Sequence, residues 1–208
     1  MKITFFGGDY IFHSKIKKNL ALALLLLFAM FIHSGCGSKN TDENIHKLVH
    51  ATYYSPNSYT AKCSVYAYTK GGVSEYECDV SYDKNKDSYI VKSDNMEISM
   101  DEKRTRISRG DNSFEAPSSP DDMYIFVNTF FKSYYESENV SMSVSENSPS
   151  ETTLLECDVI NPTPTSSHMK LWVRSDDALP VKMQVYDKDS FMHTEIVFNE
   201  FKFQKSGE

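Results

Sequence analysis

Alternation of apolar and polar side chains at every second residue is the feature that most constrains the fold of this chain. In residues 59–67 the odd positions are mostly apolar and most even positions are polar, and the alternation returns in residues 76–82. Lys70, Gly71 and Gly72 stand between the two segments as a tight turn. This arrangement predicts a β-hairpin with one buried face and one wet face.

Further short segments of this kind fill most of the remaining chain, and turn-forming Asp, Asn, Lys, Gly and Pro residues separate them. They cover residues 88–93, 96–100, 104–108, 139–145, 152–160, 168–175, 181–187 and 191–203. Residues 161–164 read as an exposed loop or a crossover. Neighbouring short strands predict one antiparallel sheet of about ten strands.

Two segments change to helical spacing. Residues 41–55 carry apolar side chains at i, i+3, i+4 and i+8, and Asn40 or Thr41 could cap the start. A second helix is predicted to begin at Ser119 and Pro120, with acids in its first turn. Its apolar stripe comprises Met123, Phe126, Val127, Phe130 and Tyr134.

A helix face so rich in Phe is expected to be buried against the sheet. We therefore predict a mainly β (α+β) domain over residues 41–208. Its architecture is a curved antiparallel half-barrel of about ten strands, with one or two helices filling the concave face.

The first 35 residues read as a signal peptide rather than as part of this domain. Three lysines between positions 15 and 18 precede an unbroken apolar run of 13 residues, 20–32. Ser34 and Gly35 then precede Cys36, in the pattern of a lipobox. We predict cleavage before Cys36, a lipid on Cys36 and a polar tether over residues 36–40. The alternatives are an ordinary secretory signal or an uncleaved anchor.

Charge excludes some classes of partner. Removal of residues 1–35 takes away four lysines and one acid, which leaves 18 basic and 28 acidic side chains and a net charge of −10. Nucleic acids and anionic headgroups are bound through basic patches. We therefore expect no nucleic-acid partner, and expect the membrane to be contacted through the lipid alone.

Catalytic and metal-binding motifs do not stand out. Four histidines follow the signal segment, and none lies in a hydrolase or zinc-protease motif. His46 and His50 are one helical turn apart, but a solvated helix edge explains them better than zinc. We expect no enzyme, no metal and no cofactor.

Three cysteines remain after Cys36. Cys63 and Cys78 both fall on the apolar face of the predicted hairpin, directly opposite each other if Lys70 and Gly71 form its loop. They either form a disulfide or remain buried thiols that pack as small hydrophobes, as Cys157 would.

Aromatic residues supply candidates for partner binding. Tyr66 and Tyr68 share the polar face of the first strand, and Trp172 lies opposite Leu171 and Val173 on its own strand. Exposed tyrosines favour protein interfaces, although they are also ordinary strand residues.

The C-terminal segments 169–174, 179–183 and 196–203, together with the opening helix and the Tyr59-Thr60-Ala61 strand, resemble lipoprotein carriers of the LolA/LolB superfamily. The lipidated chain is most similar to clostridial germination lipoproteins of the GerS type. This resemblance implies a non-enzymatic partner of a CwlD-like cell-wall amidase that serves spore cortex modification. The alternative is a lipid- or lipoprotein-binding carrier or sensor.

A filled core favours the amidase partner, and an open apolar pocket of several hundred Å³ would favour the carrier. An open half-barrel also has free sheet edges. A homodimer formed by strand exchange is therefore a further expectation.

Overall fold

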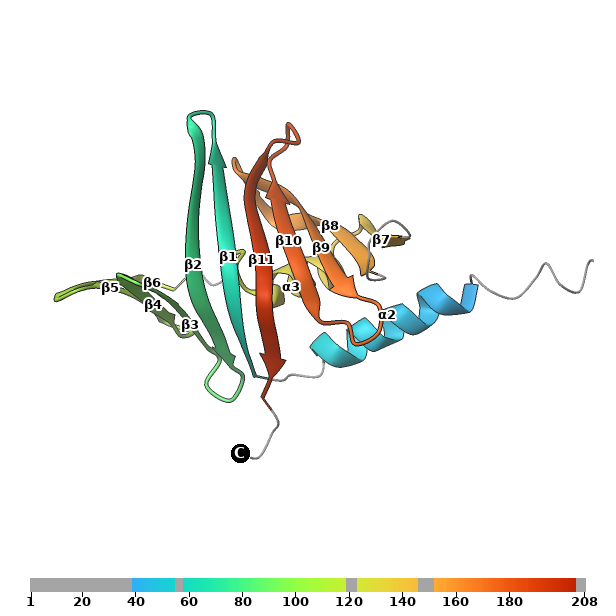
Figure 1. Cartoon of the computed structure of the whole chain (residues 1–208), viewed down its shortest axis with the longest axis horizontal. Helices are drawn as coiled ribbons and strands as arrows, with labels where there is room; N and C mark the ends of the chain where they lie inside the picture. The colour runs from blue at the N-terminus through green and yellow to red at the C-terminus, as the bar shows by residue number, and fades with distance from the viewer. Residues whose placement is uncertain (1–38, 55–57, 119–122, 146–151, 205–208) are drawn as a thin grey trace, which may run out of the picture. The chain divides into compact units, whose positions relative to one another are not determined.

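One open, curved antiparallel sheet of eleven strands forms the body of the protein (Figure 1). Its strands are β1 (Tyr59–Thr69), β2 (Gly72–Asp83), β3 (Ser88–Ser93), β4 (Met96–Met100), β5 (Arg104–Arg109), β6 (Asn112–Pro117), β7 (Val140–Ser145), β8 (Thr152–Thr163), β9 (Ser166–Arg174), β10 (Pro180–Tyr186) and β11 (Met192–Phe203). The order across the sheet is β6-β5-β4-β3-β2-β1-β11-β10-β9-β8-β7. Two meanders therefore join where the first strand meets the last, and β6 and β7 are the edges.

The computed structural model describes residues 39–54, 58–118, 123–145 and 152–204. The account below concerns the unit Asp42–Glu208. The predicted signal segment and Cys36 lie outside the described residues. Among the described helices, none has the length and apolar character needed to cross a membrane.

The predicted hairpin is confirmed in its turn and in its register. β1 ends at Thr69 and pairs with Gly72 at the start of β2, so Lys70 and Gly71 form a two-residue loop. Gly72 has a φ of 143°, a backbone conformation that would be strained for a residue with a side chain. The same register places Cys63 directly opposite Cys78.

Two helices fill the concave face, as predicted. They are α2 (Lys39–Tyr54) and α3 (Val127–Glu136), and α3 packs on β8. Phe126 and Phe130 are fully buried there, and Tyr53 of α2 stacks on Phe131 of α3 with 4.1 Å between ring centroids. Tyr53 also donates a hydrogen bond to the Ala178 carbonyl at 2.8 Å, which ties α2 to the turn before β10.

Both helix starts differ from prediction. α2 begins at Lys39, so Asn40 and Thr41 lie inside it rather than capping it. α3 begins at Val127, after Phe126 in an extended conformation. Burial of Phe126 against Tyr89, with 4.6 Å between ring centroids, accounts for the extended segment before the helix. The predicted cap at Ser119 and Pro120 lies outside the described residues.

Two connections in the sheet also differ from prediction. β6 was not predicted, because residues 112–117 carry Phe114 as their only large apolar side chain. Residues 161–163 belong to β8, which forms a hairpin with β9 rather than a crossover. The ladder is irregular between Asp158 and Thr163, and Pro162, which has no N–H to donate, falls in this interval.

Candidate protein-binding surface

The three side chains predicted to bind a partner lie on one face of the sheet, the outer face that the helices leave uncovered. Tyr66 and Tyr68 come from β1, and Trp172 comes from β9. All three are half-buried. Three inter-strand steps separate Tyr66 from Trp172, about 14 Å at ~4.8 Å per step. The fold therefore places them on one surface without bringing them into contact.

A polar network fills the space between these aromatics. Lys182 Nζ lies 4.4 Å from the centroid of the Trp172 ring, a cation–π contact, and 3.8 Å from Glu195. Gln184 donates a hydrogen bond to Glu195, and the Tyr186 hydroxyl donates one to Gln184 at 2.6 Å. These hydrogen bonds fix the side-chain orientations, so a partner would meet a preorganised surface.

We refer to this region as the outer aromatic surface. It comprises Tyr66, Tyr68, Trp172, Lys182, Gln184, Tyr186 and Glu195. Sequence analysis did not predict the last four residues of this surface. Their place at alternate strand positions was the only available signal, because the sequence does not show which strands are neighbours.

Two tyrosine hydroxyls on this surface remain protonated over a wide pH range. A hydrogen bond to Glu75 raises the pKa of Tyr66, and partial burial raises the pKa of Tyr68. The Tyr68 hydroxyl can therefore donate a hydrogen bond to a partner at neutral pH, whereas the single O–H of Tyr66 is donated to Glu75.

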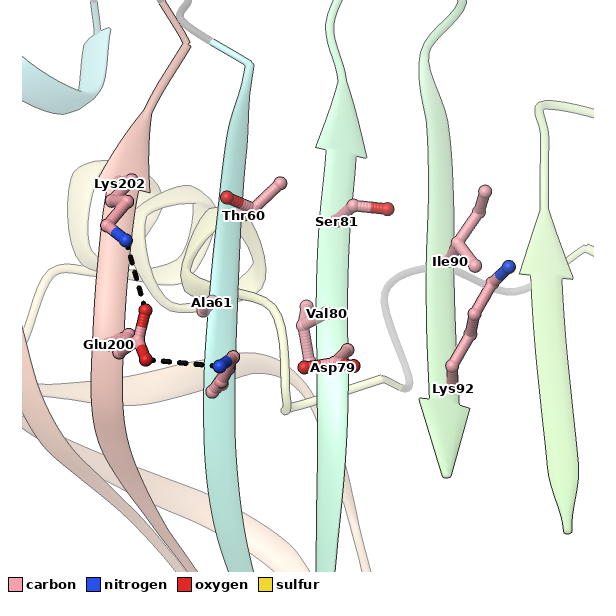
Figure 2. A pocket seen from close by; sticks show the side chains of 10 residues that line it. Thr60, Ala61, Asp79, Val80, Ser81, Ile90, Lys92, Glu200 and Lys202 are labelled. Carbon is pink, nitrogen blue, oxygen red and sulfur yellow. Dashed lines mark hydrogen bonds and ion pairs between the residues drawn. The ribbon is translucent and has the colours of Figure 1, made fainter. Parts of the chain in front are cut away.

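A shallow groove of about 420 Å³ continues the outer face across β11, β1, β2 and β3 (Figure 2). Lys62 and Lys202 bind Glu200 at 3.1 and 3.0 Å, and these contacts lower the pKa of the Glu200 carboxyl. Lys92 and Asp79 also line the groove. Charged side chains stand on all four strands of this groove, and apolar side chains of Ala61, Val80 and Ile90 lie between them.

The concave face, by contrast, is filled by the protein's own side chains. Met169, Leu171, Met183 and Ile196 are fully buried beneath the helices, as is Phe130. An acyl chain would need this volume, so the described residues favour a packed core over a carrier cavity.

The cysteine pair belongs to the same core. Cys63 and Cys78 are both buried thiols, and a hydrogen bond to Cys78 together with burial raises the pKa of Cys63. Burial raises the pKa of Cys157 to about 12. Cys63 and Cys157 are therefore poor nucleophiles at neutral pH, whereas the hydrogen bond from Cys63 lowers the pKa of Cys78.

The histidine pair on α2 faces aromatic rings. His46 lies 6.4 Å from Tyr134 and His50 lies 5.3 Å from Tyr135, measured between ring centroids. Within the described ranges, no group of three or more His, Cys, Asp or Glu side chains could hold a metal ion.

A second histidine site lies between β8 and β9. His168 contacts Asp158 through Nδ1 at 3.1 Å and Glu156 through Nε2 at 3.3 Å. Hydrogen bonds from His168 and then from Asn139 lower the pKa of the Asp158 carboxyl. This contribution to stability is present above the unfolded pKa of about 3.9 and is lost as the pH falls through the folded value.

We therefore expect Asp158→Asn to lower the urea midpoint slightly at pH 7 and to have a smaller effect near pH 3. The carboxylate is half exposed, so the difference should be small. Asp189→Asn, at an exposed turn, is the control. An Asp158→Asn effect that is equal at both pH values would contradict the linkage.

An open antiparallel sheet with its concave face packed by two helices defines the structural class of this protein. A family model described as Sporulation protein YdcC-like matches residues 17–208, and the chain belongs to this family. No curated protein matches at a significant level.

Three solved structures illustrate the similarity. An uncharacterised conserved protein from Thermus thermophilus is 11% identical over 78% of this chain and 86% of that chain, with a TM-score of 0.49. The LolA superfamily protein NE2245 from Nitrosomonas europaea is 12% identical over 78% and 93%, with a TM-score of 0.44. A chain of the Clostridioides difficile CwlD amidase–GerS lipoprotein complex is 21% identical over 85% and 98%, with a TM-score of 0.38. Both groups that the sequence resembles are thus among its similar structures.

Proposed function

We propose that this chain is a lipoprotein, anchored through a lipid such as palmitate on Cys36 at the extracytoplasmic face of a spore or forespore membrane. It acts as the non-enzymatic partner of a CwlD-like N-acetylmuramoyl-L-alanine amidase. Its role is to support muramic-δ-lactam formation in the spore cortex and thereby germination. Membership of a sporulation family supports the setting.

The observation that carries this proposal is the filled concave face. A carrier of the LolA/LolB type needs an apolar cavity for acyl chains, whereas Phe126, Phe130 and Leu171 occupy that space here. A protein with a packed core binds through its surface. The carrier reading is therefore the weaker alternative.

The outer aromatic surface supplies suitable contacts. Tyr and Trp are enriched among the residues that dominate binding energy, and Trp172 is already held by Lys182. The net charge of −10 after residue 35 favours a partner with a basic face. Added salt should then slow association, because it screens the long-range attraction.

Co-purification tests the proposal. Residues 37–208 would be mixed with candidate cortex amidases from the host, and amidase activity would be measured with and without the chain. Stable co-elution with a gain of activity would support a regulatory subunit. Absence of a complex, together with lipid bound to the purified chain, would reject it and favour the carrier.

Trp172→Ala and Tyr66→Ala should each weaken the amidase complex, about tenfold or more for Trp172→Ala, as for an interface anchor. Titration calorimetry or interferometry would measure the dissociation constants. Phe114→Ala is the matched control, because Phe114 is exposed but lies on the opposite face of the sheet. If only Phe114→Ala weakens binding, the outer aromatic surface is not the interface.

Cys36→Ala should release the chain from membranes and abolish incorporation of labelled palmitate, because no other cysteine lies near the signal segment. Fractionation of full-length wild type and variant measures this. Membrane retention without label would instead indicate an uncleaved anchor.

A further inference from the structure

The two edges of the open sheet are protected to different degrees. β6 carries Glu115 and ends in Pro117, and both residue types discourage strand pairing. β7 has the sequence Val-Ser-Met-Ser-Val-Ser, without a charged residue, a proline or a glycine. In the described part of the chain β8 is its only strand partner, so one backbone edge of β7 is open.

The side chains of β7 divide cleanly between its two faces. Val140, Met142 and Val144 stand opposite the buried Cys157, Leu155 and Thr153 of β8 and so lie on the concave side. Val140 is 47% exposed and Val144 is 36% exposed, although their cross-strand neighbours are buried. The apolar face of the sheet therefore continues to its edge without full cover. Ser141 and Ser143 are exposed on the outer side.

The segment 140–144 reads the same in both directions. If a second copy pairs antiparallel with β7 about a two-fold axis at Met142, Val140 falls opposite Val144 of the second copy. Ser141 then falls opposite Ser143, and Met142 falls opposite its own equivalent. Every cross-strand pair is thus apolar with apolar on one face and hydroxyl with hydroxyl on the other, both favourable combinations.

We propose that β7 is a self-association edge, through which two copies join their sheets by antiparallel β7–β7 pairing centred on Met142. No segment leaves its own sheet, so this differs from strand exchange. The two-fold pattern favours a second copy over a different protein, whose strand would have no reason to be matched by a palindrome.

Such a dimer should be weak in solution. One six-residue strand pair buries much less than the ~1,200 Å² of a stable complex. Anchoring of both copies in one membrane would raise their effective concentration and favour pairing. The inference goes beyond the proposed function, because it requires no amidase.

Cysteine cross-linking of the full-length chain in bacterial membranes tests the register. Met142→Cys should give a disulfide-linked dimer on a non-reducing gel, since paired Cα atoms ~4.5–5.5 Å apart lie within disulfide range. Two thiols lose two protons, and copper phenanthroline with oxygen accepts the two electrons. Val140→Cys is the control, because equivalent Cα atoms four residues out of register lie about 14 Å apart. It should give little dimer although Val140 is the more exposed.

A second experiment introduces charged residues at the exposed Ser141 and Ser143 of the Met142→Cys variant. Ser141→Lys with Ser143→Lys places lysines opposite lysines and should reduce the dimer about tenfold. Ser141→Lys with Ser143→Glu places opposite charges together and should retain it. Equal dimer from Val140→Cys and Met142→Cys, or equal dimer from both charge variants, would overturn the proposal. A cross-link from Met142→Cys to another protein alone would also overturn it.

Discussion

Phe130→Ala is expected to lower the free energy of unfolding by about 3–5 kcal/mol, the usual cost of removing a buried Phe. The Phe130 side chain is fully buried between α3 and the sheet, and its ring centroid lies 5.3 Å from that of Phe131 and 5.8 Å from that of Tyr134. The neighbouring rings of Phe131 and Tyr134 are themselves buried, which limits relaxation into the vacated space. A loss of this size is a large fraction of the roughly 5–15 kcal/mol typical of a domain.

Urea denaturation followed by circular dichroism measures this loss, and Phe114→Ala is the matched control. Phe114 is 65% exposed on β6, so its truncation should change stability by less than about 0.5 kcal/mol. A small loss for Phe130→Ala would mean that the concave face is loosely packed. That result would support the alternative function as a lipid or lipoprotein carrier.

The alternation of the sequence was sufficient to predict most of the sheet. Strand periodicity is local information, and the Lys70-Gly71 turn fixed the register of β1 with β2. The opposition of Cys63 and Cys78 followed from that register alone. The Phe-rich stripe likewise identified α3 as a helix that packs on the concave face.

Long-range pairing could not be predicted from alternation. β1 pairs with β11 through residues 59–67 and 194–203, and the paired residues lie 127 to 144 positions apart (194 − 67 and 203 − 59), so no local sequence pattern predicts this contact. The outer aromatic surface depends on this junction, because it sets the distance between Tyr66 and Trp172. Their shared face was predictable, whereas Lys182 and Glu195 between them were not.

The predicted helix starts were wrong for a different reason. Ser119, Pro120 and the acids that follow form a strong local start signal, yet the described helix begins at Val127. Burial of Phe126 in an extended conformation outweighs the propensity of residues 123–126 to continue a helix. Tertiary packing decides such boundaries.

The second large effect concerns the cysteine pair. We expect oxidised glutathione to convert Cys63 and Cys78 into a disulfide that raises the free energy of unfolding by about 3 kcal/mol, since the bond closes a loop of roughly 16 residues. The two thiols are cross-strand neighbours in the β1–β2 register. The hydrogen bond from Cys63 lowers the pKa of Cys78, so the Cys78 thiolate is the nucleophile that attacks glutathione disulfide.

Oxidation should be slow, because both thiols are buried and glutathione disulfide has little access to them. Thiol titration after denaturation of residues 37–208 should find one free cysteine instead of three, and the urea midpoint should rise by about 1–2 M. Cys157→Ala should keep the shift, since Cys157 faces Val140 and Met169 rather than another cysteine. Cys63→Ala should abolish it. Three titratable thiols after prolonged oxidation would instead establish the pair as packed thiols, with hydrophobic burial rather than a covalent bond stabilising the hairpin.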